Sequence, residues 1–468
     1  MLHSINPATG ATLATFEAHS VAEVEARLRR AHDAFPAWSH TTVADRARVI
    51  ARAGALLEQR KDEYGRLMTL EMGKLLGAAR DEAAKCATAC RYYAEHAERM
   101  LADEAVTDGA ERGYVAFHPL GVALAIMPWN FPFWQVLRFA APALVAGNVG
   151  LLKHASNVPQ CALALEQLFT DAGAPRGVFQ TLLIGSDAVG AVVDDPRVVA
   201  VSLTGSEGAG SQVARRAGER LKKQVLELGG SDPFIIMPSA HLDQAADIAV
   251  KARTINNGQS CIAAKRFIVH EQVAETFIER FVANMKALRV GDPMDAATHV
   301  GPLAMRQLVD DLETQVRDTV RAGARLLAGG ARRDGSGFYF EPTVLLDIPA
   351  NTPAYRDELF GPAASVFRAR DAKDAVRIAN DTRFGLGAAA WTNDEREASY
   401  FARELAAGTV FINGMVASDA RFPFGGVKAS GYGRELSEFG LREWVNIKTV
   451  RMFGVGGARE HSTGTLSE

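Results

Sequence analysis

The fold of this chain is decided by residues 122–157, which read VALAIMPWNFPFWQVLRFAAPALVAGNVGLLKHASN. Two apolar runs of strand length, Val122–Met127 and Val149–Leu152, enclose a stretch with helical patterning. A strand, a helix and a second strand in this order are typical of a parallel sheet with helices on its faces. The segment therefore predicts an α/β fold.

The same alternation continues after residue 157. Amphipathic segments such as Pro159–Asp171 and Glu207–Arg220 separate further strand-like runs, which are Val178–Ile184, Val198–Leu203 and Gln224–Leu228. Ligands of such sheets bind outside the carboxyl ends of the strands, so we expect a site along that edge. The residues that stand out there are Pro128-Trp129-Asn130, Lys153, Gly185, Thr204-Gly205-Ser206 and Glu227.

The rest of the chain predicts helices before this sheet and a second α/β region after it. Residues 20–100 read as helical, with a capping box at Ser20 and Glu23 and two long helices, Arg46–Leu70 and Lys74–Leu101. The tail from Gly454 is weakly patterned and is expected to be mobile. Between residues 229 and 430 the strand-like runs are Phe234–Met237, Phe267–Val269, Ala364–Phe367, Ala388–Trp391 and Thr409–Ile412.

Bulk composition excludes several classes of protein. A chain of 468 residues exceeds the size of one core, so we expect two or more domains. A net charge of −3 gives no reason to expect nucleic acid or an anionic membrane as a partner. No apolar run reaches the roughly 20 residues of a membrane helix. The first residues lack a secretory signal, which favours the cytoplasm.

The four cysteines do not suggest a disulfide framework or a metal site. Cys86 and Cys90 stand four residues apart in a helical pattern, a spacing that could hold half a metal site. No matching pair of cysteine or histidine residues lies nearby, so packing is the better interpretation and no metal is expected.

A lone cysteine follows a glycine-centred turn in Asn257-Gly258-Gln259-Ser260-Cys261, and Glu227 lies upstream. A free thiol has a pKa of about 8.5 and is a fair nucleophile near neutral pH. A carboxylate of the same site could activate water against whatever the thiol has captured. This pair indicates covalent catalysis on a carbonyl. The alternative is a buried structural cysteine.

A glycine-rich segment, residues 205–210 (GSEGAG), follows the Val198–Leu203 run and opens a helix. Glycines and helix N-terminal amides suit a pyrophosphate, although the spacing is not the usual G-x-G-x-x-G. An ordinary glycine-rich helix start is the alternative, but its place in the series favours a dinucleotide. Lys153 could contact a ribose or offset a 2′-phosphate charge, or be a solvated strand-end lysine. His154 is interpreted as structural.

Together these motifs resemble the aldehyde dehydrogenase superfamily from about residue 5 to 453. The blocks that carry the resemblance are residues 128–132 (PWNFP), Lys153, 204–206 (TGS), 227–230 (ELGG), 258–261 (GQSC), 358–362 (ELFGP) and 423–431 (PFGGVKASG).

The resemblance implies a Rossmann-type NAD(P)-binding domain, an α/β catalytic domain and a β oligomerisation element. The expected boundaries are 1–106 and 120–228 for cofactor binding, 229–431 for catalysis, and 107–119 with 432–453 for oligomerisation. Residues 454–468 are the tail. A homodimer or homotetramer is expected.

Site roles follow from the same resemblance. Cys261 corresponds to the nucleophile, the Asn130 side chain to half of the oxyanion hole, and Glu227 to the general base. Ser156 replaces a glutamate of many NAD-using relatives, so NADP is expected to be accepted, alongside NAD or in its place. The implied cofactor-binding residues are Trp129, Lys153, Ser156, Gly185, Thr204, Gly205, Ser206, Leu228, Glu358 and Phe360.

Three further blocks are residues 152–157 (LKHASN), 261–268 (CIAAKRFI) and 417–421 (ASDAR). They resemble those of bacterial succinate-semialdehyde dehydrogenases, which implies oxidation of succinate semialdehyde to succinate. Arg138 and Ser418 correspond to anchors for the distal carboxylate of the substrate. A second arginine of that group is replaced by Ile255, and Arg421 or Arg253 could substitute for it.

Three other functions remain open at this stage. The enzyme could oxidise another small aliphatic or carboxylated aldehyde. Acyl transfer to coenzyme A is a second class, which Glu227 disfavours. A non-catalytic scaffold would predict damage at Cys261, Glu227 or Asn130, and all three are intact.

Overall fold

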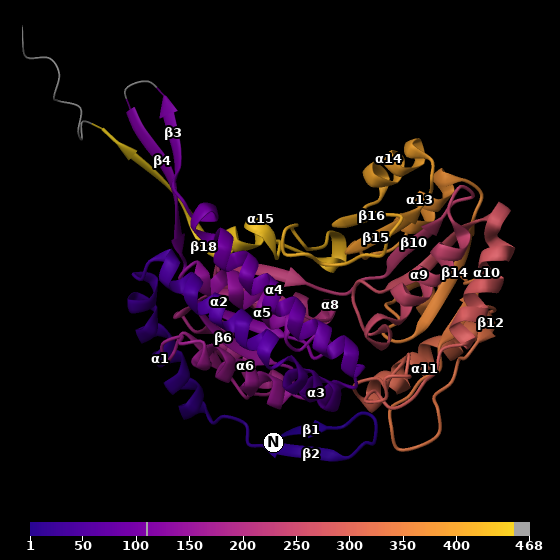
Figure 1. Cartoon of the computed structure of the whole chain (residues 1–468), viewed down its shortest axis with the longest axis horizontal. Helices are drawn as coiled ribbons and strands as arrows, with labels where there is room; N and C mark the ends of the chain where they lie inside the picture. Colours follow the sequence, from indigo (N-terminus) through magenta and orange to yellow (C-terminus); the bar gives the residue numbers. More distant parts are fainter. Residues whose placement is uncertain (109–110, 454–468) are drawn as a thin grey trace, which may run out of the picture.

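The computed structural model describes residues 1–108 and 111–453, and Figure 1 shows two α/β bodies side by side with a narrow arm on one of them. Buried strands of the first body form a sheet in the order β17-β9-β8-β5-β6-β7. The parallel strands are β5 (Val122–Met127), β6 (Val149–His154), β7 (Phe179–Thr181), β8 (Val198–Thr204) and β9 (Lys223–Glu227).

Helices pack against this sheet and connect its strands in the predicted βαβ manner. They are α5 (Trp134–Val145), α6 (Pro159–Asp171), α7 (Ser186–Asp194) and α8 (Glu207–Glu219). The last strand, β17 (Gly431–Tyr432), comes from a distant part of the chain and pairs antiparallel with β9. The predicted α/β fold class is therefore confirmed.

Four helices precede the sheet. They are α1 (Val21–Ser39), α2 (Val43–Gln59), α3 (Lys61–Met72) and α4 (Leu76–Met100). Helix α1 packs against the strands of the sheet, and the other three pack on one another and on α5 and α6. The Ser20–Glu23 capping box is present at the start of α1. The single helix expected over Arg46–Leu70 is wrong, because the chain leaves helical geometry at Arg60 (φ −104°, ψ 18°). There the Arg60 guanidinium pairs with Asp171 at the end of α6, at 2.6 Å.

The second body is built on a seven-stranded sheet in the order β12-β13-β14-β11-β10-β15-β16, parallel except for β12. Its strands are β10 (Asp232–Ile236), β11 (Ala264–His270), β12 (Arg325–Ala328), β13 (Thr343–Leu346), β14 (Ala363–Ala369), β15 (Gly387–Trp391) and β16 (Thr409–Ile412). Its helices are α9 (Leu242–Thr254), α10 (Glu271–Lys286), α11 (Arg306–Arg321), α12 (Pro353–Arg356), α13 (Ala372–Asn380) and α14 (Glu395–Glu404).

The projecting arm is a three-stranded antiparallel sheet in the order β18-β4-β3 (Figure 1). Its strands are β3 (Glu104–Asp108), β4 (Glu111–Pro119) and β18 (Val445–Met452), which follows the short helix α15 (Ser437–Arg442). An N-terminal hairpin pairs β1 (Leu2–Ile5) with β2 (Thr12–Phe16). The tail expected from Gly454 lies outside the described residues.

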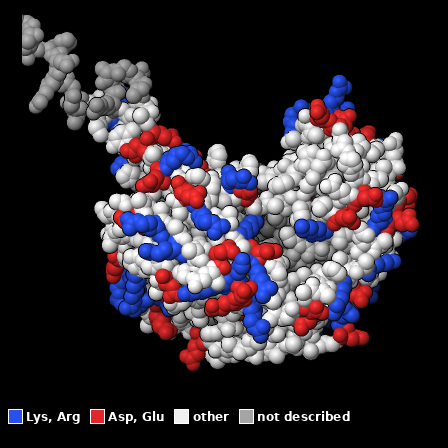
Figure 2. All heavy atoms as spheres, viewed as in Figure 1, with Lys and Arg blue, Asp and Glu red and all other residues white. Residues whose placement is uncertain are grey.

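The surface drawn in Figure 2 carries positive and negative side chains interspersed, in keeping with the small net charge. No helix in the described part of the chain is long and apolar enough to cross a membrane.

Candidate active site

The turn that carries Cys261 joins α9 to β11 through a short 3₁₀ segment, Ile255–Gly258. Asn256 (φ 54°) and Asn257 (φ 57°) adopt the left-handed conformation that asparagine tolerates better than most residues. Gly258 has φ +79°, and a Cβ there would lie 2.3 Å from the backbone of Gly361. The local sequence thus folds into a tight turn that packs directly on the 358–362 segment.

Buried side-chain amides fix this turn to its surroundings. Asn257 Nδ2 donates to the carbonyls of Gly73 (2.9 Å) and Pro302 (3.1 Å). Asn256 Nδ2 donates to the carbonyls of Asn130 (2.7 Å) and Gln259 (3.0 Å). These bonds tie the cysteine turn to the loop after β5, so that the two sequence-predicted motifs meet.

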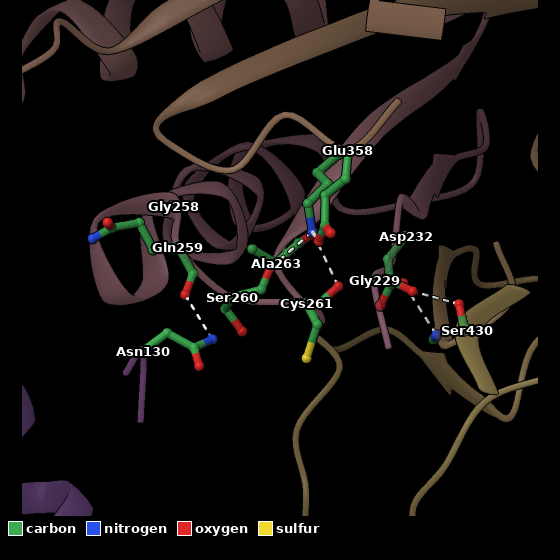
Figure 3. A network of polar contacts seen from close by, with 12 residues as sticks. Asn130, Gly229, Asp232, Gly258, Gln259, Ser260, Cys261, Ala263, Glu358 and Ser430 are labelled. Atoms are coloured by element: carbon green, nitrogen blue, oxygen red, sulfur yellow. Dashed lines mark hydrogen bonds and ion pairs between the residues drawn. The ribbon is translucent and has the colours of Figure 1, made fainter. Parts of the chain in front are cut away.

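A buried cation also holds the turn. Lys265 Nζ donates to the carbonyls of Ser260 (2.8 Å), Cys261 (3.0 Å) and Ala263 (3.1 Å) and forms an ion pair with Glu358 at 3.1 Å. Figure 3 shows this network, with Cys261 Sγ pointing away from Glu358. Burial lowers the pKa of Lys265, while Glu358 is the main charge that opposes this shift.

Asn130 lies beside the cysteine turn, directly after β5 (Figure 3). Its Nδ2 donates to the Gln259 carbonyl at 3.1 Å, which uses one of its two amide hydrogens. Within the described residues, the backbone N–H of Cys261 donates no hydrogen bond. A second amide hydrogen of Asn130 and the Cys261 N–H are therefore available to an oxyanion.

Glu227 ends β9 and is almost completely buried. Neither carboxylate oxygen accepts a hydrogen bond from a described residue. Burial raises its pKa well above the usual range, the Glu435 carboxylate raises it further, and Arg138 opposes both effects. Gly425 has φ +157°, and a Cβ there would approach Glu227 Oε1 to 2.8 Å. A carboxylate with a raised pKa and free lone pairs is suited to accept a proton.

The Cys261 thiol differs from the sequence expectation. Burial raises its pKa to about 12, although the nearby Arg138 charge lowers it. The thiol is thus protonated at neutral pH, not partly ionised as a free cysteine would be. Attack on a carbonyl consequently needs a base to take the thiol proton.

A cavity of about 300 Å³ opens at Cys261 and is walled mainly by apolar side chains such as Phe131, Ile262 and Phe424. Arg138 and Ser418 both line it, as does Ile255, where the second arginine was expected. The Arg138 guanidinium is buried and forms an ion pair with Glu435 at 2.8 Å. The cavity therefore places the Cys261 thiol and the buried Arg138 guanidinium on the walls of one largely apolar space.

The two arginines expected to replace the missing one do not reach this cavity. Arg253 is buried below the turn and donates to the Gly258 carbonyl at 2.7 Å. Arg421 is exposed and pairs with Asp419 at 2.6 Å. Neither lines the cavity.

The residues expected to bind the cofactor lie at the carboxyl ends of adjacent strands. Lys153 lies in β6, is largely buried, and its ammonium has no hydrogen bond or ion pair within the described chain. Ser156, just beyond, is exposed. The hydroxyl of Thr204, at the end of β8, is buried without a partner. These unpaired groups line the edge predicted to bind a ligand.

The start of α8 fits a pyrophosphate. Ser206 caps it by accepting from the Ala209 N–H at 3.3 Å, and a Cβ at Gly208 would meet nothing within 4 Å. Leu228, after β9, packs against this helix start at Gly210, and Gly185 forms the cap of α7. Open glycine backbone at a helix N-terminus accommodates phosphate oxygens, so these residues fit a dinucleotide.

Trp129 and Phe360 come together from the two bodies, with ring centroids 5.8 Å apart and edge to face. Phe360 belongs to the same segment as Glu358, whose carboxylate lies against Lys265. Glu358 and Phe360, two of the residues expected to bind the cofactor, are thus beside the cysteine turn.

Comparison with known proteins shows the family to which this chain belongs. The family model described as "Aldehyde dehydrogenase family" matches residues 1–450. This chain belongs to the aldehyde dehydrogenase family.

Three relatives illustrate where in the family this aldehyde dehydrogenase stands. It is 57% identical over 450 residues to "Succinate-semialdehyde dehydrogenase [NADP(+)] 1" of Mycobacterium tuberculosis, covering 96% of this chain and 98% of the relative. A "Probable succinate-semialdehyde dehydrogenase [NADP(+)]" of Synechocystis is 54% identical over 447 residues, with coverages of 96% and 98%. The crystal structure of succinic semialdehyde dehydrogenase from Streptococcus pyogenes with NADP+ superposes with a TM-score of 0.94 at 36% identity, covering 96% and 99%.

Two lysines of this aldehyde dehydrogenase site were missed by the sequence reasoning. Lys265 stands next to Arg266 near the start of the buried strand β11. Two adjacent basic residues at the start of an apolar run could have indicated a buried charge with a role in the site. Lys85 lies on α4 and lines the cavity, with its Nζ 2.8 Å from Ser418 Oγ. Nothing in the helical pattern distinguishes Lys85 from a lysine on a solvated face.

Proposed function

We propose that this aldehyde dehydrogenase oxidises a small semialdehyde with a distal carboxylate, best succinate semialdehyde, to the dicarboxylate, with NADP accepted as cofactor. The observation that carries the proposal is the buried Arg138 guanidinium in the same apolar cavity as Cys261. An arginine fork in a desolvated site binds a carboxylate strongly. The relatives named above for succinate semialdehyde and NADP support the same choice.

The site residues suit two proton transfers and one covalent intermediate. Cys261 Sγ forms a bond to the aldehyde carbon while its proton passes to a solvent water molecule. The carbonyl π electrons move to oxygen, and that oxyanion accepts hydrogen bonds from Asn130 Nδ2 and the Cys261 N–H. Such donors typically lower a barrier by about 3–4 kcal/mol. A nicotinamide held by Glu358 and Phe360 would supply the two-electron oxidation of this carbon, so that a thioester remains on Cys261.

Hydrolysis then uses Glu227 as the base. The carboxylate takes a proton from water as the water oxygen attacks the thioester carbon. The C–S bond breaks, the carboxylic acid leaves, and the thiol is restored when the proton passes from Glu227 to sulfur. A buried base without competing hydrogen bonds suits this step.

The domain and assembly assignments belong to this proposal. We infer a cofactor domain of residues 1–106 and 120–228, a catalytic domain of 229–431 and oligomerisation elements of 107–119 and 432–453. The arm exposes large apolar side chains, including Val106, Ile447 and Phe453, each more than half exposed. Exposed apolar strands of this kind support burial against a second copy, in a homodimer or homotetramer.

An aldehyde panel with both cofactors tests the proposed function. The highest kcat/KM is expected for succinate semialdehyde with NADP+, followed at 340 nm, and butanal should be at least tenfold poorer. Equal kcat/KM for both aldehydes would count against a distal-carboxylate substrate. Stimulation of turnover by coenzyme A would favour acyl transfer instead of hydrolysis.

Ser156→Glu should move the cofactor preference toward NAD. Ser156 is exposed beyond β6, close in sequence to the unpaired Lys153, so a glutamate there would repel a 2′-phosphate and bind ribose hydroxyls. We expect the NADP/NAD ratio of kcat/KM to fall about a hundredfold, which is about 2.7 kcal/mol. Ser156→Gln is the neutral control of similar size. An unchanged ratio in Ser156→Glu would refute the role of Ser156.

Arg138 is tested without leaving a buried charge unpaired. Because Arg138 and Glu435 form a buried ion pair, the double variant Arg138→Met/Glu435→Gln removes both charges together. The KM for succinate semialdehyde should rise at least tenfold, and that for butanal much less. Glu435→Gln alone is the control. Equal effects on the two aldehydes would refute the anchor.

A further inference from the structure

Besides Arg138, which is paired with Glu435, and Lys74, which is paired with Glu82, the cavity is lined by Lys85 from α4, a helix that precedes the sheet. Lys85 Nζ donates to Ser418 Oγ at 2.8 Å and lies 4.3 Å from the centre of the Trp134 ring. Trp134 Nε1 also donates to Ser418 Oγ, at 3.1 Å. An ammonium, an indole N–H and a hydroxyl thus meet at one point of the cavity wall.

Lys85 has no carboxylate partner among the described residues. Glu82, on the same helix, is taken by Lys74 and by the N–H groups of Phe133 and Trp134. Asp419 is paired with Arg421. Glu82 and Asp419 are therefore engaged by other partners. Asp81, one turn before Lys85, also lines the cavity but forms no ion pair with Lys85 in the described chain.

The charged groups that face Lys85 do not neutralise the positive charge of its ammonium. From α5 it faces Arg138, whose own charge is paired with Glu435. From its own helix it faces Glu82 and the Cys86 thiol, and from the 418–421 loop it faces Asp419. Burial, with the Arg138 charge second, lowers the pKa of Lys85 to about 8. An ammonium held in such surroundings is best stabilised by an anion that enters the cavity.

We infer that Lys85 binds the distal carboxylate of the substrate, with Ser418 and Trp134 Nε1 beside it and Arg138 as the second cation. The inference rests on the proposed function, since it requires a substrate with a distal carboxylate. Lys85 then supplies the charge that Ile255 cannot, from a different element of the fold. It is a specificity-determining residue and takes no part in the bond changes at Cys261.

Lys85→Met tests this inference, because methionine keeps the length of the apolar stem. The KM for succinate semialdehyde should rise about 30-fold, or about 2 kcal/mol, and the KM for butanal less than threefold. Lys85→Arg should restore most of the affinity. The inhibition constant of succinate against butanal oxidation should rise in parallel with the KM for the semialdehyde.

The control for general charge attraction is Lys251→Met. Lys251 lies at the exposed rim of the same cavity, on α9, so its removal changes the net charge equally. If Lys251→Met raised the semialdehyde KM as much as Lys85→Met, the effect would be long-range attraction and the inference would be wrong.

A pH series gives a readout that a purely structural lysine would not move. Above pH 8 the wild-type Lys85 loses its charge, so the ratio of semialdehyde KM to butanal KM should rise with pH. The titrations of Cys261 and Glu227 affect both aldehydes and cancel in this ratio. In Lys85→Arg the ratio should stay flat over the same range, because arginine remains charged.

Failure of the inference is distinguishable from failure of the proposed function. If Lys85→Met left the semialdehyde KM within twofold while Arg138→Met/Glu435→Gln raised it, Lys85 would have no anchoring role and the function would stand. Equal losses on both aldehydes would make Lys85 structural. If the wild-type enzyme showed no preference for the semialdehyde, the function would fail and the inference with it.

Discussion

Cys261→Ala is expected to lower kcat by more than about 10⁴-fold while leaving cofactor affinity within a few fold. The substitution removes the only sulfur among the described residues that line the cavity, so no thioester can form. Turnover at 340 nm measures the first effect and fluorescence titration with NADPH the second. Retention of even a few per cent of wild-type kcat would contradict covalent catalysis through Cys261.

Thiol labelling provides an independent check on the same residue. Cys86, Cys90 and Cys161 are fully buried, whereas Cys261 is partly accessible. Native enzyme should therefore take up one iodoacetamide per subunit, and denatured enzyme four. Labelling should become faster as pH rises, since the raised pKa of Cys261 keeps it protonated near neutrality.

Glu227→Gln should convert steady turnover into a single burst. The variant can still form a thioester but hydrolyses it roughly 10²–10⁴-fold more slowly, because the base is gone. A rapid-mixing experiment should show up to about one equivalent of NADPH per subunit, followed by a slow phase. An acyl adduct on Cys261 should then be detectable by intact-mass spectrometry.

The pH profile adds a second criterion for Glu227. A carboxyl group acts as a base only above its pKa, and burial beside Glu435 raises that pKa above its ordinary value. Wild-type kcat should therefore increase with pH through that raised pKa, and Glu227→Gln should lose this limb. Glu435→Gln is the matched control, because it removes an equally buried carboxylate; it should show no burst. Unchanged steady-state turnover in Glu227→Gln would exclude Glu227 as the base.

The fold could be predicted because the strands of both sheets are short, apolar and regularly separated. Val122–Met127 and Thr409–Ile412 begin and end in the structure where the pattern placed them. The break at Arg60 could not be predicted from the local pattern, and the partner that Arg60 has there, Asp171, lies more than a hundred residues away. Local periodicity continues smoothly through that position.

In the site, too, local motifs identify some residues, whereas the roles of others depend on contacts that are distant in sequence. Cys261, Asn130 and Glu227 stand in motifs that identify them individually, and the structure brings the first two side by side. The functions of Lys85 and Lys265 depend on what lies opposite them, namely Ser418 and the carbonyls of the cysteine turn. Nor could the sequence show that burial would raise the pKa of Cys261 to about 12.

The pairing of β17 with β9 has a consequence for biosynthesis. Glu227 lies opposite Gly431, so the sheet edge that carries it stays open until more than nine-tenths of the chain has left the ribosome. Trp444, fully buried against Phe139, is made later still. The first body therefore stays incomplete while the whole second body is synthesised. During that time we expect chaperones to be needed at the unpaired edge of β9.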